Sequence, residues 1–538
     1  IGIQSFDQII EDGYVYVDKT EMIYSLVKEG KIYFLSRPRR FGKSLLLSTL
    51  KNYFLGRKEL FKGLAIDRLE KDWLEYPVFH IDFNGSDFQE EGTLEKVIEE
   101  HISAWEKAYA ILPDQSRDRG MRFIQVLREA HARVGRRAVV LIDEYDKPIL
   151  DVLDTGLETV VGENRMSLED RNRGILKGFY SVFKAADEHL QFVLLTGVTK
   201  FSQVSVFSGF NQPRDISMDE QFESLCGITG EELESYFAIS MQDGSVEKNP
   251  DGSLDIFISA DESEEELARK NELTVEEMKQ LVKAQYDGYH FGTGLIDIYN
   301  PFSLLNAFIS KRISDYWFQS GTPTYLVRLL RHTRENLDEM TGRYYRTPEF
   351  VDYKADVEKP LPMIYQSGYL TIKDFNRRRN TFLLDFPNNE VKNGFLSVVA
   401  SDYLKPRTEI NSWVQDVVDA LQEGKAEEFG VLLTSFLSDI PYTMRRKENE
   451  RERERYFHYT FYLILRLVSV YTVYTEKQQS EGRVDCIVET DRYIYIFEFK
   501  LDGTAADALR QIEEKGYARP YLNDPRRLYR IGVSFSSE

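Results

Sequence analysis

Cysteine is scarce in this 538-residue chain, which contains only Cys226 and Cys486. Two thiols cannot build the disulfide framework of a small secreted domain, and they suit a reducing compartment such as the cytoplasm. No apolar run approaches the roughly 18 residues of a membrane span, so no membrane contact is expected. The first residues, "IGIQSFDQII", lack the basic stretch and apolar core of a signal peptide. The sequence therefore predicts a cytoplasmic protein.

Positive charge is also in deficit, with 69 Lys and Arg against 89 Asp and Glu and a net charge of −20. Such a balance opposes non-specific binding to nucleic acid over the whole surface, although a local basic groove is compatible with it. Hydrophobic residues make up 42% of the chain and aromatic residues 13%, which suits a packed globular protein. The length indicates roughly three to four domains.

The segment "RPRRFGKS" (residues 37–44) ends in the Gly-Lys-Ser of a phosphate-binding loop. The run "KIYFLS" before it predicts a strand, and "SLLLSTLKNYFLG" after it has apolar residues at helical spacing. A P-loop requires this strand–loop–helix context. Arg37, however, stands where the G-x-x-x-x-G-K-[ST] pattern has its first glycine, so a basic surface turn is the alternative interpretation.

The residue types of this segment suit phosphate binding. In a P-loop, Gly42 would let the backbone approach the phosphates, Lys43 would reach the β and γ phosphates, and the Ser44 hydroxyl would hold Mg²⁺. Two further arginines would add positive charge to the loop. The residues expected to contact ATP here are Arg39, Arg40, Phe41, Gly42, Lys43, Ser44 and Leu45.

A second motif, "RRAVVLIDEYDKP", begins with the continuous apolar run typical of a strand that is buried on both faces. The strand ends in Asp143 and Glu144, as a Walker B motif does. Asp143 would hold the metal ion, and Glu144 would orient the attacking water as the catalytic residue. Asp146 is a third carboxylate close by. An ordinary acidic loop is the alternative, but the pairing with Gly-Lys-Ser upstream favours an ATPase.

Two more stretches predict strands of the same sheet, "YPVFHIDF" (residues 76–83) and "FVLLTGVTKFS" (residues 192–202). Strands and amphipathic helices alternate between residues 30 and 200, which indicates a parallel α/β sheet. The second stretch turns polar at Thr196. When a strand lies between the two Walker strands, a polar residue at its tip can sense the γ phosphate, and Thr196 is the candidate; ordinary turn chemistry around Gly197 is the alternative.

These motifs resemble the AAA-ATPase-like family of bacterial proteins. The resemblance is carried by "YVYVDKT", "RPRRFGKSLLLSTL", "LIDEYDKPI" and "LLTGVTKFS", and it extends to "YDGYHF" and "NPFSLLNAF". In that family the loop usually reads RPRRFGKS, so Arg37 is implied to be a family feature rather than a defect. The family is similar to the P-loop ATPases that include the STAND switches. The resemblance implies an ATP site made by Lys43, Ser44, Asp143 and Glu144.

The stretch from residue 216 to 300 is expected to form a helical lid on the ATPase. Thr274 and Glu277 have the spacing of a capping box at the start of one helix. A polar-aromatic cluster follows, which either approaches the nucleotide or shapes a structural turn around Gly288. Its members are Tyr286, Asp287, Tyr289 and His290.

Two strands, "GYLTIKDFN" and "NTFLLDFPN", flank three arginines at residues 377–379. A strand–basic turn–strand hairpin after helices is compatible with a winged-helix module, whose wing contacts a phosphate backbone. A solvated turn is the alternative.

The C-terminal stretch "EGRVDCIVETDRYIYIFEFK" predicts a hairpin. If Asp491 and Arg492 form a two-residue loop, antiparallel register places Asp485 opposite Glu498, and Lys500 shares the face of Glu498. A one-residue slip would break this arrangement. Convergent carboxylates bind Mg²⁺ or Mn²⁺, and a nearby lysine can orient water or stabilise charge on a phosphodiester.

This D…E-x-K pattern resembles the PD-(D/E)XK nucleases, with Asp485, Glu498 and Lys500 as implied catalytic residues and the two carboxylates as metal ligands. A later helix offers Gln511 and Lys515. The upstream stretch "ENERERERYFHYTFYLILRLVSV" resembles the first helix of that domain. Glu454 within it is a candidate outer metal ligand, with salt bridging on an exposed face as the alternative.

We therefore expect an α/β multidomain protein: a P-loop AAA-like ATPase domain (1–215), a helical lid (216–300), a mixed, winged-helix-like region (301–404) and a PD-(D/E)XK nuclease-like domain (405–538). The expected function is Mg²⁺-dependent ATP hydrolysis coupled to a metal-dependent nuclease that acts on nucleic acid, DNA in preference to RNA. The alternative is an ATP-dependent STAND-like switch or scaffold whose nuclease-like domain binds a protein partner without cutting. These patterns leave the oligomeric state open, and Arg214 is a candidate for an arginine finger.

Overall fold

The computed structural model describes residues 2–114, 116–161, 164–200, 213–237, 274–319, 340–351, 360–395, 410–438, 472–479, 482–501 and 503–535. The chain divides into two compact units. The first comprises residues 1–335 and 339–391, and the second comprises residues 336–338 and 392–538. Within the described residues, no helix combines the length and the apolar character that crossing a bilayer requires.

A five-stranded sheet forms the centre of the first unit, in the order β2-β3-β6-β1-β7, and all its strand pairs are parallel. Every residue of β3 is buried, because helices cover both faces of a parallel sheet. The order places β6 between the strands that carry the two Walker-like motifs, as expected. The strands are β1 (Ile32–Ser36), β2 (Val78–Asp82), β3 (Ala138–Asp143), β6 (Leu190–Gly197) and β7 (Arg214–Asp215).

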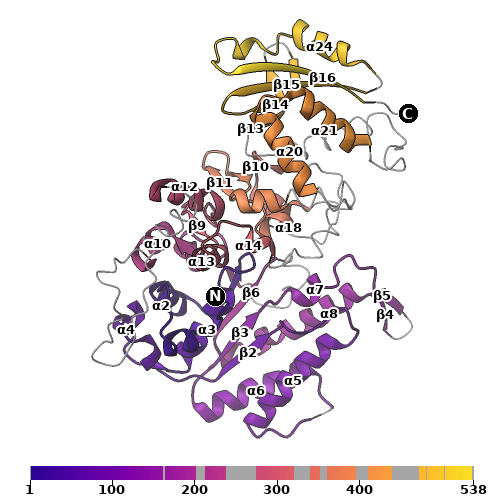
Figure 1. The fold of residues 1–538 in the computed structure, drawn as a ribbon. Helices are drawn as coiled ribbons and strands as arrows, with labels where there is room; N and C mark the ends of the chain where they lie inside the picture. The colour runs from indigo at the N-terminus through magenta and orange to yellow at the C-terminus, as the bar shows by residue number, and fades with distance from the viewer. Residues whose placement is uncertain are drawn as a thin grey trace. The chain divides into compact units, whose positions relative to one another are not determined.

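Helices surround this sheet in the first unit. Figure 1 shows α5 and α6 running side by side along it, and α3 packs against β3. The hairpin of β4 and β5 contacts α8. The helices and the hairpin strands are α1 (Phe6–Glu11), α2 (Thr20–Glu29), α3 (Lys43–Phe54), α4 (Ala65–Leu69), α5 (Thr93–Ala108), α6 (Arg119–Val134), α7 (Lys147–Leu150), β4 (Glu158–Val161), β5 (Asn164–Ser167), α8 (Leu168–Tyr180) and α9 (Val182–Ala185).

The middle region, defined here as the described residues between 216 and 391, belongs to the same unit. Its first part packs α10, α12 and α13 around a shared apolar cluster that includes Met278 and Leu304. The predicted capping box of Thr274 and Glu277 is confirmed at the start of α12. This part contains β8 (Ile228–Thr229), α10 (Gly230–Phe237), α12 (Val275–Tyr286), β9 (Ile298–Tyr299), α13 (Pro301–Ser310) and α14 (Tyr316–Gln319).

The second part of the middle region holds a three-stranded antiparallel sheet in the order β10-β12-β11. The predicted hairpin around the three arginines is confirmed, and its turn is closed by Asn380 in the left-handed conformation. The winged-helix assignment and the division of the chain into four domains stay predictions. The elements are β10 (Arg343–Tyr345), α17 (Thr347–Phe350), α18 (Leu361–Gln366), β11 (Thr371–Asn376) and β12 (Thr381–Asp385).

The second unit contains a four-stranded sheet in the order β13-β14-β15-β16, in which only β15 and β16 pair in parallel. Helix α24 connects these two strands. The hydroxyls of Tyr493, Tyr495 and Tyr529 donate to backbone carbonyls at the end of α20 and in the turn after it. The elements are α20 (Ile410–Gln422), α21 (Ala426–Ser438), β13 (Thr472–Gln479), β14 (Gly482–Glu489), β15 (Tyr493–Leu501), α24 (Ala505–Glu514) and β16 (Arg527–Phe535). The predicted helix with Glu454 lies outside the described residues.

Candidate nucleotide and metal sites

The loop between β1 and α3 has the backbone shape of an anion cradle. Arg40 and Gly42 both have left-handed φ angles, 70° and 93°. A Cβ at Gly42 would meet no atom within 4 Å, so the dihedral angle rather than lack of space favours glycine there. Helix α3 begins at Lys43 and has no acidic residue in its first turn. Its free backbone N–H groups and its dipole therefore offer positive potential to a ligand.

The Lys43 ammonium lies at the centre of the loop and is almost fully buried, with 4% of the side chain exposed. It donates to the carbonyl oxygens of Arg37 at 3.1 Å and Pro38 at 3.3 Å. The Glu144 carboxylate lies 3.4 Å away. The structure thus brings the two predicted residues Lys43 and Glu144 together.

Asp143 is oriented by three donors at the carboxyl end of β3. The Ser44 hydroxyl donates to Oδ2 at 2.5 Å, and the Thr196 hydroxyl donates to Oδ1 at 2.7 Å. The backbone N–H of Glu144 also donates to Oδ1, at 3.0 Å. Thr196 therefore contacts the Asp143 carboxylate, and its role as a γ-phosphate sensor stays a prediction.

The two acidic residues that follow Asp143 have different environments. Glu144 has a φ of 49°, a left-handed angle that is uncommon outside glycine and typical of strained functional turns. Asp146 is fully buried and accepts from Thr199, from both its backbone N–H at 2.6 Å and its hydroxyl at 2.7 Å. Burial and the neighbouring Glu144 raise the pKa of Asp146 to about 6. A Cβ at Gly197 would lie 2.5 Å from Asp146, so this aspartate anchors the tip of β6.

A cavity of about 940 Å³ opens beside the loop, within the range of small-molecule sites. Its polar end is formed by the phosphate-binding loop and by Glu144. Its other side is apolar and comes from the N-terminal segment and from α13. The lining residues include Tyr14, Val15, Val17, Arg39, Arg40, Phe41, Gly42, Lys43, Ser44, Leu45, Glu144, Phe302, Leu305 and Trp317.

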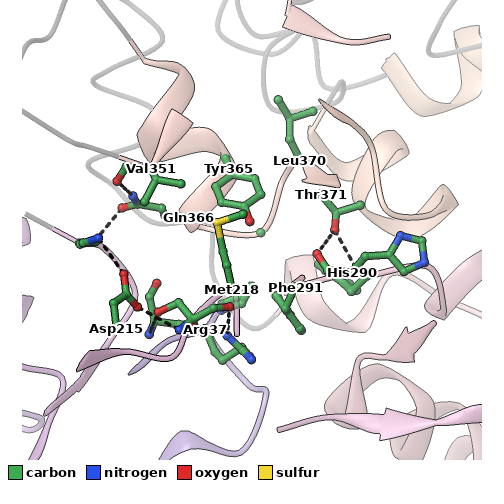
Figure 2. A pocket seen from close by; sticks show the side chains of 16 residues that line it. Arg37, Asp215, Met218, His290, Phe291, Val351, Tyr365, Gln366, Leu370 and Thr371 are labelled. Carbon is green, nitrogen blue, oxygen red and sulfur yellow. Dashed lines mark hydrogen bonds and ion pairs between the residues drawn. The ribbon is translucent and has the colours of Figure 1, made fainter. Parts of the chain in front are cut away.

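Some predicted residues lie elsewhere. Tyr289 and His290 line a smaller pocket, shown in Figure 2, and His290 is within 2.7 Å of the Asp297 carboxylate. Arg214 forms ion pairs with Glu29 and Asp219 on the edge strand β7. These pairs occupy its guanidinium, and its role as an arginine finger stays a prediction.

The C-terminal hairpin has the predicted register. The backbone N–H of Thr490 donates to the Tyr493 carbonyl at 2.8 Å, and Cys486 pairs with Phe497. Asp485 and Glu498 come one step beyond this last printed pair, and they are close enough for the charge of Asp485 to raise the pKa of Glu498. The Phe499 backbone N–H donates to the Asp485 carboxylate at 2.8 Å, which fixes the orientation of that side chain.

Glu498, Lys500 and Gln511 form one polar group on this sheet. The Lys500 ammonium is 3.5 Å from Glu498 Oε1 and donates to Gln511 Oε1 at 2.5 Å. The Gln511 amide nitrogen donates to Glu498 Oε1. Gln511, predicted to lie on the following helix, is therefore brought to the site, whereas Lys515 forms the C-cap of α24.

The second carboxylate oxygen of Glu498 suits a metal ligand. It is buried and has no hydrogen-bond partner, and such groups are rare unless something binds them. Burial, the largest cause, and the negative charge of Asp485 raise the pKa of Glu498 to about 7, although Lys500 acts in the opposite direction. Within the described residues no group of three or more His, Cys, Asp or Glu side chains converges. A hard cation held by two carboxylates, with water completing the shell, fits this donor set.

No motif in the sequence pointed to several residues that the structure places at the nucleotide cavity. Asn84, Lys147 and Trp317 all line this cavity. The Trp317 indole N–H donates to the Arg39 carbonyl at 3.1 Å. Asn84 follows β2, the neighbour of β3, so its position could be predicted only once the strand order was known.

Comparison with known proteins gives two family matches. Residues 1–207 match the predicted AAA-ATPase model, and residues 452–538 match the PD-(D/E)XK nuclease superfamily. An uncharacterized protein in the vnfD 5′ region of Azotobacter chroococcum mcd 1 is 34% identical over 545 residues. That alignment covers 100% of this chain and 96% of the relative. The chain belongs to a family of predicted AAA-ATPases that carry a PD-(D/E)XK nuclease superfamily domain at the C-terminus.

Proposed function

We propose that the protein binds and hydrolyses ATP with Mg²⁺ in the 940 Å³ cavity beside the phosphate-binding loop. The observation that carries this proposal is the convergence of Lys43, Ser44 and Glu144 at the polar end of one cavity. Asp143 is buried behind Ser44 and accepts from its hydroxyl. Phosphate oxygens would replace the carbonyl and carboxylate partners that Lys43 has now. The apolar side of the cavity would take the nucleoside, and the helices of residues 216–300 would act as a lid.

The roles of the chain's residues follow from their positions. Ser44 and Asp143 would hold Mg²⁺, which neutralises charge on the phosphates when bound. The first turn of α3 would bind the phosphate oxygens through its N–H groups. Glu144, 17% exposed and at the edge of the cavity, would orient the attacking water and accept its proton. Thr196 would keep Asp143 in place and, through it, respond to the γ phosphate.

We further propose that the C-terminal domain is a metal-dependent nuclease, acting on DNA in preference to RNA. Asp485 and Glu498 would hold Mg²⁺ or Mn²⁺, which would activate water and stabilise charge on the phosphodiester. Lys500 would orient the water, and its bond to Gln511 positions it. ATP turnover would control this activity. Both cysteines are buried and neither forms a disulfide, which suits the cytoplasmic location that we propose.

One observation favours a second function. The net charge of −20 opposes binding to a polyanion over most of the surface. An ATP-dependent switch whose nuclease-like domain binds a protein partner without cutting would be free of that repulsion.

The first experiment measures ATP hydrolysis by the full chain with Mg²⁺. Lys43→Ala should abolish ATP binding, and Glu144→Gln should keep binding while turnover falls about 100-fold or more. Lys51→Ala is the matched control, because Lys51 is an exposed residue of the same helix α3. Equal hydrolysis by wild type and both site variants would remove the ATPase proposal.

The second experiment offers linear, circular and single-stranded DNA and RNA to the protein with Mg²⁺ or Mn²⁺, with and without ATP. Glu498→Ala should abolish cleavage, whereas Glu513→Ala, an exposed glutamate of α24, should not. Dependence of cutting on ATP would establish coupling. ATP hydrolysis without cutting of any substrate would favour the switch.

A further inference from the structure

The phosphate-binding loop has a second side that faces the middle region. Each residue from Arg37 to Phe41 contacts that region. A Cβ at Gly368 would lie 2.6 Å from the Pro38 ring, and the Trp317 indole bonds the Arg39 carbonyl. The remaining contacts are those of Arg40 with the Phe302 ring at 4.8 Å, of Phe41 with the Tyr289 ring at 4.7 Å, and of Arg37 with residues 217–223 and Phe291.

Arg37 makes the largest number of these bonds. One terminal nitrogen donates to the Ser217 carbonyl at 2.8 Å, and the other donates to the carbonyls of Phe222 at 3.1 Å and Glu223 at 3.3 Å. The guanidinium also stacks over the Phe291 ring, with 4.2 Å between the two. Figure 2 shows Arg37 and Phe291 at one pocket, which Tyr365 and Gln366 also line.

A charged arginine is energetically unfavourable at this buried position. Arg37 is 1% exposed, its partners are neutral carbonyl oxygens, and its Nε has no hydrogen-bond partner. Burial lowers the pKa of Arg37, which means that the charged form is poorly solvated. A methionine would fill the same space without that penalty. The geometry therefore suggests that the guanidinium serves a purpose other than stability.

The backbone of Arg37 connects these bonds to Lys43. Its N–H donates to the Gly197 carbonyl at 3.2 Å, and its carbonyl accepts from the Lys43 ammonium. The side chain thus fixes, from the middle region, the peptide that positions the phosphate-binding lysine. A glycine at residue 37 would keep the backbone bonds and lose every bond to residues 217–223.

We infer that Arg37 is a positioning residue that joins the phosphate-binding loop to the middle region. Binding of nucleotide in the cavity and the contact of the loop with Trp317 then depend on each other. This inference rests on the proposed nucleotide site. Arg37 acts through the loop and through Lys43, without contact with the phosphates. A ligand that moves residues 37–41 would disturb the contact of Arg37 with Phe291 and the hydrogen bond between Arg39 and Trp317. Because Trp317 belongs to α14, movement of the loop would act directly on that helix.

The test uses Arg37→Gly, which restores the complete G-x-x-x-x-G-K-S pattern. If Arg37 only fills the place of that glycine, ATP binding should stay equal or improve. Our inference predicts a rise of about tenfold or more in the Kd for ATP. Arg37→Lys keeps the charge but has a single nitrogen to donate hydrogen bonds. Its Kd for ATP should therefore lie between the values for wild type and Arg37→Gly.

Trp317 supplies a readout that a general loss of stability would not reproduce. Its emission is isolated as the difference between each protein and the same protein with Trp317→Phe, since the chain has four tryptophans. In wild type this signal should change on addition of ATP. In Arg37→Gly it should differ from wild type already without nucleotide, and ATP should change it little.

Arg122→Met is the matched control for a lost buried arginine. Arg122 is 3% exposed, and it bonds Glu106 and Glu99 between α5 and α6. The Arg122→Met substitution should lower the melting temperature and leave the Kd for ATP and the Trp317 signal unchanged.

If Arg37→Gly does not fold, the comparison of Arg37→Lys with Arg122→Met tests the inference instead. A wild-type Kd and Trp317 response in the Arg37 variants would overturn the inference, whereas failure of wild type to bind ATP would overturn the proposed function instead.

Discussion

Glu390 is the buried acid whose titration should have the clearest effect on stability. Its side chain is fully buried, and Oε1 accepts from the Trp317 backbone N–H at 2.7 Å. Burial raises the pKa of Glu390 from an ordinary 4.5 to about 8, and this effect outweighs the hydrogen bond from the Trp317 backbone N–H, which lowers the pKa. At neutral pH the carboxyl group is therefore protonated in the folded protein.

The sign and the size of the effect follow from this shift. The pKa is raised in the folded state, so between pH 4.5 and pH 8 the folded state keeps a proton that the unfolded state has released. Stability must then fall as pH rises, by about 1.4 kcal/mol per pH unit for this group. Between pH 6 and pH 7.5 the expected loss is about 2 kcal/mol. Glu390→Gln is neutral at every pH and should not show this loss.

Urea denaturation of the full chain at a series of pH values measures the effect, with the transition of the first unit followed through Trp317 emission. The difference in unfolding free energy between Glu390→Gln and wild type should grow with pH. Glu59→Gln is the control, because Glu59 is exposed and its substitution should leave the pH dependence unchanged. Parallel curves for Glu390→Gln and wild type would refute the assignment of a protonated Glu390.

Three further predictions concern the loop and the second unit. Gly42→Ala should lower the free energy of unfolding by about 1–2 kcal/mol, because residue 42 has a φ of 93°. Gly174→Ala in α8, where a Cβ would meet no atom within 4 Å, should raise it by about 0.5–1 kcal/mol, and thermal unfolding measures both changes. Tyr495→Phe should cost about 1–2 kcal/mol in the denaturation of the second unit, because a buried backbone carbonyl of α20 loses its donor at 2.6 Å. Asp485→Asn should lower the pKa of Glu498 from about 7, measured by carbon NMR titration without metal, and an unchanged pKa would contradict their proximity.

Local patterns predicted the parts of the fold that depend on neighbouring residues. The strands of the parallel sheet were visible as apolar runs, and the capping box at Thr274 needed only a four-residue pattern. The register of the C-terminal hairpin, from Glu489 with Ile494 to Cys486 with Phe497, followed from one turn, because a two-residue hairpin loop determines the register of the pairs that follow it.

Long-range contacts could not be predicted in this way. The partners of Arg37 lie about 180 residues further along the chain, and no local spacing connects them. Trp317 bonds Arg39 across 278 residues. The bond from the Thr196 hydroxyl to Asp143 could not be predicted either, because it depends on the register of β6 against β3.

The measurement that tests the account most directly is calorimetric titration of ATP with Mg²⁺ into the full chain, wild type against Lys43→Ala. The account predicts binding to one site per chain by wild type and a loss of about 100-fold or more in affinity for Lys43→Ala, because the buried ammonium is the cation at the centre of the loop. Lys51→Ala should bind as wild type does. Equal affinity for ATP in wild type and Lys43→Ala would contradict the central claim that this loop is the nucleotide site.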